Sequence, residues 1–158
     1  MSKQNCIIVD IDGTVSDLSH SLHMIKVKPR GEEAPIDYDL FNAACVDDEP
    51  IKPIINLVKS YLKANRGTEL FFCTGRSMKC SEQTIWWLKK YFPSFNWHLL
   101  MRDEFDKRSD FLVKKDLHKD HILTKGYCVD FVIDDRDRVV KMWRDIGLIC
   151  IQPKEGDY

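Results

Sequence analysis

Residues 6–15 read Cys-Ile-Ile-Val-Asp-Ile-Asp-Gly-Thr-Val, and this stretch decides the fold. Cys6–Val9 is apolar without the alternation of a half-buried strand, which is typical of a strand buried on both faces of a parallel α/β sheet. Gly13 then permits the backbone angles of a sharp turn. Ligands of open α/β sheets bind beyond the carboxyl ends of the strands, so Asp10 and Asp12 are predicted to lie at a binding site. Two carboxylates this close favour a shared cation or proton.

The length and charge of the chain limit the classes of protein to which it can belong. The 158 residues, 44% of them hydrophobic, are enough for a single domain spanning 1–158 with its own core. Lys and Arg total 24 against 25 for Asp and Glu, which argues against binding of nucleic acid by bulk electrostatics but not against an enzyme that contacts a nucleic-acid end. No membrane-spanning run or signal peptide is predicted. The six cysteines form no CxxC pair, so we expect a reduced, cytoplasmic protein.

Strand-like and helix-like segments alternate after Pro50. Strands are predicted over 68–73, 97–101, 129–133 and 148–151, and helices over 53–66, 81–91, 109–122 and 136–146. Alternation of this kind predicts a parallel sheet with right-handed crossovers.

The segment from 16 to 49 is the least regular part of the chain. A short helix is predicted over 16–25, an exposed loop over 26–35, where proline and glycine interrupt a charged run, and a second short helix over 37–45. An acidic turn, 47–49, follows. This insertion is too short for a domain and adjoins the Asp10–Asp12 turn, so we expect a small flap beside the site.

The tryptophans are predicted to be mainly core residues. Trp86 and Trp87 are adjacent on a predicted helix, so one can face the core while the other points outward. Trp97 and Trp143 lie within apolar patterns. An exposed tryptophan could stack on a base, but core packing is the stronger expectation.

Chemically active side chains stand where the predicted strands end. They are Asp10 and Asp12 after the first strand, Thr74 and Arg76 after the second, Arg102 after the third, and Asp134 and Asp135 after the fourth. Four carboxylates at one edge would bind Mg²⁺, which keeps waters and meets a substrate phosphate. The hydroxyl of Thr74 and the Lys114–Lys115 pair add groups that neutralise a phosphoryl group during transfer. No cysteine or serine is paired with a base, so a carboxylate forming an aspartyl-phosphate is the expected nucleophile.

These motifs resemble the haloacid dehalogenase (HAD) phosphohydrolase superfamily. The matching residues are Ile7–Thr14, Phe71–Thr74, a lysine on a helix, and Val132–Asp135. Within the superfamily, the chain most resembles the 3′-phosphatase domains of T4-type phage polynucleotide kinase-phosphatases, through Thr74–Arg76, 101–114, 133–147 and 156–158. The resemblance implies a Rossmann-like three-layer sandwich with a central parallel sheet and, in place of a large cap, the short 16–49 flap.

The resemblance also implies a role for each site residue. Asp10 would be the nucleophile, and Asp12 the acid that protonates the leaving oxygen and then activates water. Thr74 would bind the phosphoryl oxygens, and Lys114 would hold the phosphate beside the nucleophile. Mg²⁺ would be held by Asp134, Asp135, the Asp10 carboxylate and the Asp12 backbone carbonyl.

The resemblance also places further residues near the phosphate. Arg76 and Arg102 match family arginines near the phosphate, with Gly75 completing the substrate-binding set. Lys114 is preferred to Lys115 because it keeps the family spacing from Arg102. Asp110 also matches a family aspartate, but its role here could be limited to capping a helix or pairing with a nearby residue. The sequence contains no GxxxxGK[ST] loop, so the kinase half has no counterpart here.

The predicted reaction is therefore Mg²⁺-dependent removal of a 3′-phosphate from a DNA or RNA end, with no stable protein partner indicated. Two alternatives remain open. The first is hydrolysis of a 5′- or 3′-nucleotide or another small phosphomonoester. The second is a non-enzymatic phospho-acceptor switch, although such receivers place the acidic pair on the first strand, whereas here that pair comes last. An inactive binding module is the least favoured reading, because every motif is intact.

Overall fold

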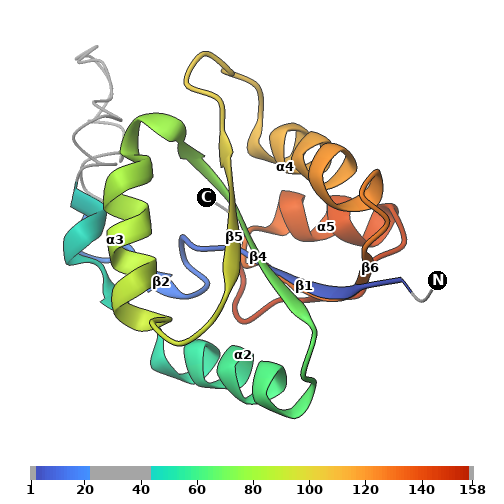
Figure 1. Cartoon of the computed structure of the whole chain (residues 1–158). Coiled ribbons are helices and arrows are strands. Elements are labelled where there is room, and N and C mark those ends of the chain that lie inside the picture. The colour runs from blue at the N-terminus through green and yellow to red at the C-terminus, as the bar shows by residue number, and fades with distance from the viewer. Residues whose placement is uncertain (1–2, 22–43, 157–158) are drawn as a thin grey trace.

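The structure is a computed structural model, and it describes residues 3–21 and 44–156. Its centre is a sheet of five parallel strands in the order β5-β4-β1-β6-β7 (Figure 1). The strands are β1 (Asn5–Val9), β4 (Glu69–Ser77), β5 (Trp97–Arg102), β6 (Cys128–Ile133) and β7 (Cys150–Ile151). The helices are α2 (Lys52–Ala64), α3 (Ser81–Tyr91), α4 (Asp110–His118) and α5 (Asp137–Asp145). The predicted α/β fold with a central parallel sheet is confirmed.

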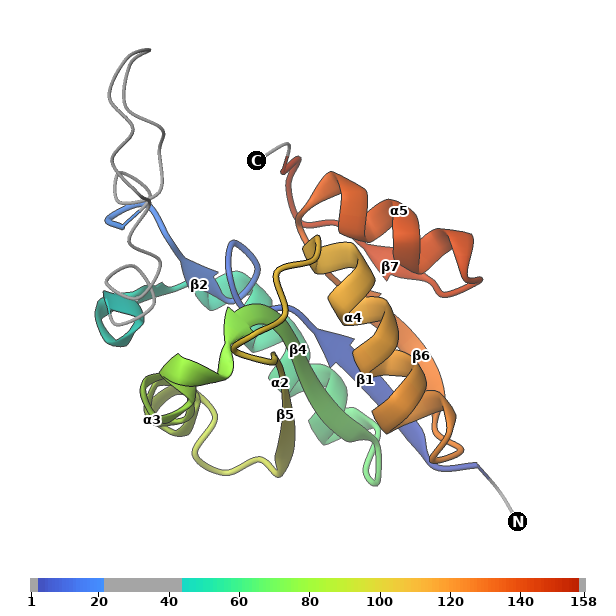
Figure 2. The same cartoon turned by 90° about the horizontal axis from the view of Figure 1, so that it is seen from above.

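The helices lie in two layers, with α2 and α3 on one face of the sheet and α4 and α5 on the other (Figure 2). The central strand β1 serves both layers. Ile7 and Val9 pack into the core with α2 and α3, while Cys6 and Ile8 pack into the core with α5. The four buried positions of β1 after the exposed Asn5 therefore carry apolar residues, because both faces of this strand are covered.

The strand order also fixes where a ligand can bind. β1 lies between β4 and β6, so the chain leaves β1 toward one side of the sheet and later returns on its other side. A crevice opens beyond the carboxyl end of a strand at such a switch point. Asp10 follows β1 at this point, as the sequence predicted.

The predicted elements after Pro50 are confirmed with shifted ends. β4 runs beyond Cys73 to Ser77, with an irregular register against β5. The helix expected over 109–122 divides into α4 and a π-helical stretch, η4 (Lys119–Leu123). The short 3₁₀ helix η3 (Met78–Cys80) leads into α3.

The prediction for the start of the insertion is wrong. Ser16–Asp17 is a strand, β2, which pairs antiparallel with β3 (Glu49–Pro50). The reason lies in the preceding turn, where the Ile11 carbonyl accepts hydrogen bonds from the amides of residues 14, 15 and 16. The chain therefore leaves the turn extended.

Only the end of the insertion can be compared further. A 3₁₀ turn, η2 (Ala44–Asp47), occupies the end of the helix predicted over 37–45. The loop predicted over 26–35 and the rest of that helix lie outside the described residues, so the flap stays a prediction.

The tryptophan prediction is confirmed. Trp87 and Trp143 are fully buried, and Trp97 packs against the core, whereas Trp86 is 54% exposed. Among the described helices, none has the length and apolar character needed to cross a membrane.

Candidate active site

Asp10, Lys114 and Asp134 form the centre of the site. Asp10 stands just beyond β1, where its backbone N–H donates to the Ile133 carbonyl at 2.9 Å. The ammonium group of Lys114, on the second turn of α4, donates to Asp10 Oδ1 at 2.7 Å and to Asp134 Oδ2 at 2.8 Å. All three side chains are buried, at most 5% exposed. The structure thus brings together a carboxylate pair and a lysine from three elements far apart in sequence.

Asp135 completes an acidic cluster. Asp10, Asp134 and Asp135 each offer one carboxylate oxygen, and these oxygens lie within 4.8 Å of one another. Three convergent carboxylates are the hard oxygen ligands that Mg²⁺ prefers, so the donor set fits that ion. Thr14 joins this cluster although the sequence analysis gave it no role: its hydroxyl donates to Asp10 Oδ2 at 3.3 Å and to Asp135 Oδ1 at 3.5 Å. The signal was present, since Thr14 belongs to the opening motif.

Burial and charge set the protonation of this centre. Burial raises the pKa of Asp10 well above its usual range, against the attraction of Lys114, and the neighbouring carboxylates raise it further. Burial alone would lower the pKa of Lys114, but Asp10 and Asp134 outweigh it and raise that pKa. The lysine therefore stays charged and partly balances a cluster whose carboxylates repel one another.

Trp143 contacts the centre directly, and Thr74 lies buried in β4. The indole N–H of Trp143, on α5, donates to Asp134 Oδ2 at 3.2 Å. Thr74 is fully buried within β4, and its hydroxyl oxygen accepts from the Arg76 backbone N–H at 3.1 Å. Thr74 thus lies buried in the part of β4 whose register against β5 is irregular.

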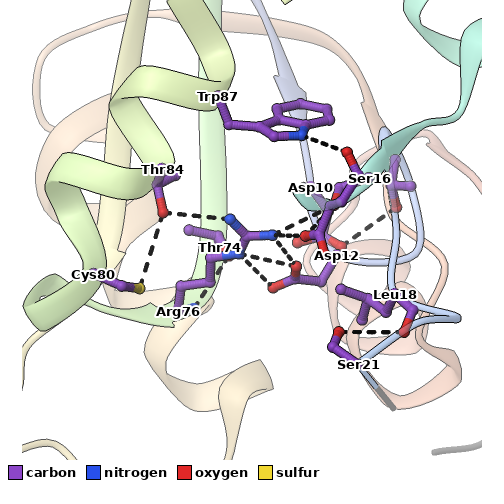
Figure 3. Close-up of polar contacts among 12 residues, drawn as sticks. Asp10, Asp12, Ser16, Leu18, Ser21, Thr74, Arg76, Cys80, Thr84 and Trp87 are labelled. Atoms are coloured by element: carbon purple, nitrogen blue, oxygen red, sulfur yellow. Dashed lines mark hydrogen bonds and ion pairs between the residues drawn. The ribbon is translucent and has the colours of Figure 1, made fainter. Parts of the chain in front are cut away.

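Arg76 reaches across to Asp12 (Figure 3). Its Nε lies 2.9 and 3.0 Å from the two carboxylate oxygens of Asp12, and its Nη2 lies 2.5 Å from Oδ1. The guanidinium group is buried and also contacts Thr84 Oγ1 on α3 at 3.4 Å. In this structure Arg76 therefore holds Asp12, and its predicted contact with the phosphate stays a prediction.

Asp48 is the main residue that the sequence analysis missed. Its carboxylate is fully buried and accepts hydrogen bonds from Arg76 Nη2 at 2.9 Å and Ser16 Oγ at 2.6 Å. His20 Nε2 lies 2.7 Å from the other carboxylate oxygen, and the Trp87 indole N–H donates to the Asp48 backbone carbonyl at 2.8 Å. Burial raises the pKa of Asp48, although the Ser16 and Arg76 contacts oppose this. The acidic turn 47–49 was visible in the sequence, but its burial was not.

Arg102 and Gly75 lie side by side at the rim. Arg102 Nε donates to the Gly75 carbonyl at 2.9 Å, and its Nη1 donates to the carbonyls of Asp106 and Arg108 at 3.2 and 2.5 Å. A β-carbon on Gly75 would stand 3.4 Å from the Asp110 β-carbon. Arg102 thus ties β4 to the 103–109 loop, and phosphate binding by Arg102 and Gly75 stays a prediction.

The structure places Lys114, Lys115 and Asp110 in different surroundings. Lys114 points into the acidic centre, whereas the neighbouring Lys115 is exposed. Asp110 forms an ion pair with Arg136, which precedes α5, so it bridges the starts of α4 and α5. This is the local pairing that the sequence analysis allowed for Asp110.

The C-terminal segment packs against a metal-ligand candidate. Gly156 lies so close to Asp135 that an added β-carbon would stand 2.5 Å from the Asp135 carbonyl oxygen. The Gln152 amide N–H₂ also donates to that oxygen, at 2.8 Å. The segment therefore fixes the backbone that carries the Asp135 carboxylate.

Solved structures of lower identity define the class of the fold. The chain matches the class C acid phosphatase from Bacillus anthracis with a TM-score of 0.64 at 20% identity, over 99% of this chain and 70% of that one. It matches CbbY from Rhodobacter sphaeroides with a TM-score of 0.55 at 12% identity, over 98% of this chain and 87% of that one. At these identities the two matches show that the chain shares its fold with these proteins.

A family model over nearly the whole chain shows its class, a HAD-type phosphatase domain, which is a hydrolase acting on phosphate esters. The model of the polynucleotide kinase PNKP phosphatase domain matches residues 4–158, so the chain belongs to that family. A putative bifunctional polynucleotide kinase/RNA ligase of Autographa californica nuclear polyhedrosis virus is 38% identical over 121 residues, which are 77% of this chain and 17% of that protein. The resemblance drawn from the motifs is confirmed.

Two solved structures extend the comparison over the whole chain. Both are chains from structures of the Pnkp1/Rnl/Hen1 complex, one described as an RNA repair complex, and each gives a TM-score of 0.78 at 30% identity over 100% of this chain. The match covers 45% and 48% of those chains, so this chain spans less than half the length of these relatives. These relatives were solved as parts of a complex, in contrast to the absence of a stable partner that the sequence analysis expected for this chain.

Proposed function

We propose that this chain removes the 3′-phosphate from polynucleotide ends, leaving a 3′-hydroxyl group. The observation that carries the proposal is the buried contact of Lys114 with Asp10 and Asp134, in a chain of the PNKP phosphatase family. The centre has the parts that transfer of a phosphoryl group requires: a carboxylate at a strand end, a fixed cation and a set of metal ligands.

Asp10 is the nucleophile of this proposal. One of its carboxylate oxygens attacks phosphorus and forms an aspartyl-phosphate as the bond to the 3′-oxygen breaks. Lys114 stands 2.7 Å from Asp10 and neutralises charge that develops on the phosphoryl oxygens, while Thr74 offers its hydroxyl to one of them. Mg²⁺ held by Asp10, Asp134 and Asp135 would supply further positive charge to the phosphate.

Asp12 is the proton donor and acceptor. It gives its proton to the departing 3′-oxygen and then takes one from the water that hydrolyses the aspartyl-phosphate. Asp12 is half-buried, with 18% of its side chain exposed, and Arg76 fixes its orientation through two carboxylate contacts. A general acid must be aimed at the leaving oxygen, and the contact with Arg76 fixes the direction of the Asp12 carboxyl group.

The substrate is the finer part of the proposal. Two kinds of relative support a polynucleotide as the substrate. They are the viral polynucleotide kinase/RNA ligase and the chains of the RNA repair complex. By analogy, we expect this chain to work beside end-repair partners, supplied by the same or by another polypeptide.

The test compares four substrates at matched concentration: an oligonucleotide with a 3′-phosphate, the same strand with a 5′-phosphate, and the 3′- and 5′-mononucleotides. We expect the 3′-phosphorylated oligonucleotide to have the highest kcat/KM, measured as phosphate release. If the 5′-mononucleotide is hydrolysed fastest, the protein is a nucleotidase. A stable phosphoprotein without turnover on any substrate would instead indicate a phospho-acceptor switch.

A further inference from the structure

Phe105 is the most exposed large apolar side chain among those that the structure describes, with 78% of its surface accessible. It lies in the 103–109 loop between β5 and α4. A single exposed apolar side chain is ordinary on a protein surface. Phe105 differs in two respects, namely the support of its backbone and its place beside the site.

The loop is held by hydrogen bonds on both sides of Phe105. The Phe105 backbone N–H donates to Asp103 Oδ1 at 2.9 Å, and the Asp106 backbone N–H donates to the Asp103 carbonyl at 3.1 Å. The Arg108 backbone N–H donates to Asp106 Oδ1 at 3.0 Å, and Arg102 binds two carbonyls of the same loop. These bonds fix a tight turn that presents the phenyl ring to solvent.

Both ends of the loop abut the candidate active site. At one end, Arg102 contacts the Gly75 carbonyl, next to Thr74. At the other end, Asp110 lies against Gly75 and begins the helix that carries Lys114. The loop rises beyond the sheet in Figure 1 and lies between α3 and α4 in Figure 2, at the edge where β1 and β4 end.

The charges of the loop favour an uncharged, aromatic contact over a phosphate contact. Asp106 and Arg108 pair with each other, and Arg108 also reaches Asp116 on α4 at 2.8 Å. Across the loop, the acidic Asp103, Glu104 and Asp106 stand against the basic Lys107 and Arg108, and Asp103 accepts the backbone bond described above. The loop therefore offers an aromatic face without an excess of basic side chains, which suits the face of a nucleobase rather than a phosphate group.

We propose that Phe105 is a stacking platform for an unpaired base near the 3′-phosphate of the polynucleotide substrate. The inference rests on the proposed function and adds to it a subsite that separates a polynucleotide from a small phosphomonoester. The ring binds the base by its π-face, so the contact holds the strand without selecting its sequence.

The experiment combines a change in the protein with a change in the substrate. Phe105→Ala, Phe105→Tyr and Leu123→Ala are compared with the unaltered protein on a 3′-phosphorylated single strand and on copies that lack the base at the first, second or third position from the 3′ end. Leu123 is the control, because it is 60% exposed and lies near the other end of the sheet, before β6. The measured quantity is kcat/KM for phosphate release.

We expect Phe105→Ala to lower kcat/KM about ten-fold on the intact strand, a loss within the range of one base–aromatic stack. One of the abasic strands should show a similar loss with the unaltered protein and no further loss with Phe105→Ala, because the ring and the base act as a pair. Phe105→Tyr should retain activity, and Leu123→Ala should match the unaltered protein.

Two results separate the possible failures. If the unaltered protein does not hydrolyse the 3′-phosphorylated strand, the proposed function fails and this inference fails with it. If it does, but Phe105→Ala costs nothing or its loss adds to that of every abasic strand, the stacking role alone is overturned. A loss shared by Leu123→Ala would likewise overturn it, since the effect would not be specific to the loop.

Discussion

Arg76 Nε contacts both carboxylate oxygens of Asp12, and Arg76 Nη2 donates to Asp48 Oδ2 at 2.9 Å as well as to Asp12 Oδ1. The Arg76 and Asp48 side chains are almost fully buried. Burial lowers the pKa of an arginine, but Asp12 outweighs it and raises the pKa of Arg76, so the group is always charged. A buried guanidinium charge needs oppositely charged partners. For Arg76 these are Asp12, the proposed general acid, and Asp48, which anchors the arginine.

The first prediction concerns that anchor. Asp48→Ala should lower kcat about ten-fold or more, because Arg76 loses a buried counter-charge and no longer fixes Asp12. The loss should be larger on an alkyl phosphate than on an aryl phosphate, whose leaving group needs less protonation. Asp48→Asn keeps an oxygen for Arg76 and should retain more activity.

Asp47→Ala, at the exposed neighbouring residue, is the control. An equal loss on both substrates would show that Asp48 does not act through Asp12.

The second prediction concerns the nucleophile. Asp10→Asn should abolish turnover, since a neutral amide cannot attack phosphorus. The protein should stay folded, because Lys114 keeps its contact with Asp134 at 2.8 Å. Circular dichroism and thermal unfolding check the fold, and phosphate release checks the activity. Substantial turnover by the folded variant would refute the assignment.

The third prediction concerns the cation. Mg²⁺ should raise the Tm of the protein and be required for turnover, because it offsets the repulsion among Asp10, Asp134 and Asp135. EDTA should remove both effects and added Mg²⁺ restore them, whereas Ca²⁺ should support turnover poorly, since its looser coordination holds nucleophile and phosphate less well in line. Asp134→Asn should weaken the Tm increase. Asp145→Asn, on the exposed side of α5, should not. Full activity in EDTA would contradict the proposed centre.

The sequence predicted those parts of the site that follow directly from strand ends. Asp10, Thr74 and Asp134 each follow or end a strand whose apolar pattern is unambiguous, and parallel strands necessarily bring their carboxyl ends to one edge. Lys114 was assigned through the resemblance, and the structure places it between two of these carboxylates.

The contacts of Arg76 and Asp48 could not be predicted in the same way. The link between residues 48 and 76 depends on how the chain returns from the insertion along β3, and no periodic pattern encodes that path. The start of the insertion was misjudged for a related reason: the hydrogen bonds to the Ile11 carbonyl override the local preference of 16–25. Polar contacts among loops depend on tertiary packing, which residue spacing does not specify.

The fourth prediction concerns acid stability. His118 is buried against Trp143, with ring centres 5.7 Å apart, and burial lowers its pKa from 6.5. The imidazole is mostly neutral in both states well above pH 6.5, and as the pH falls through 6.5 the unfolded chain takes up the proton before the folded chain does. The contribution of His118 to the free energy of unfolding should therefore fall as the pH drops from 7 to 5.5. The Tm of His118→Gln should fall less over this range than that of the unaltered protein. His121→Gln, at an exposed position, should behave as the unaltered protein, and an unchanged acid response of His118→Gln would refute the role of His118.

The last prediction concerns Gly156, whose position leaves no room for a side chain. A β-carbon there would stand 2.5 Å from the Asp135 carbonyl oxygen and 3.0 Å from its carbon, and backbone atoms cannot rotate away as a flexible side chain does. Gly156→Ala should therefore displace either the C-terminal segment or the backbone of Asp135.

The displacement should be seen in the metal dependence rather than in the fold. We expect Gly156→Ala to raise the Mg²⁺ concentration needed for half-maximal activity by about ten-fold, the scale on which supporting residues act on metal ligands. Glu155→Ala, one residue earlier and exposed, is the matched control. If the Mg²⁺ dependence of Gly156→Ala equals that of the control, the segment yields without moving Asp135, and its packing has no part in holding the metal.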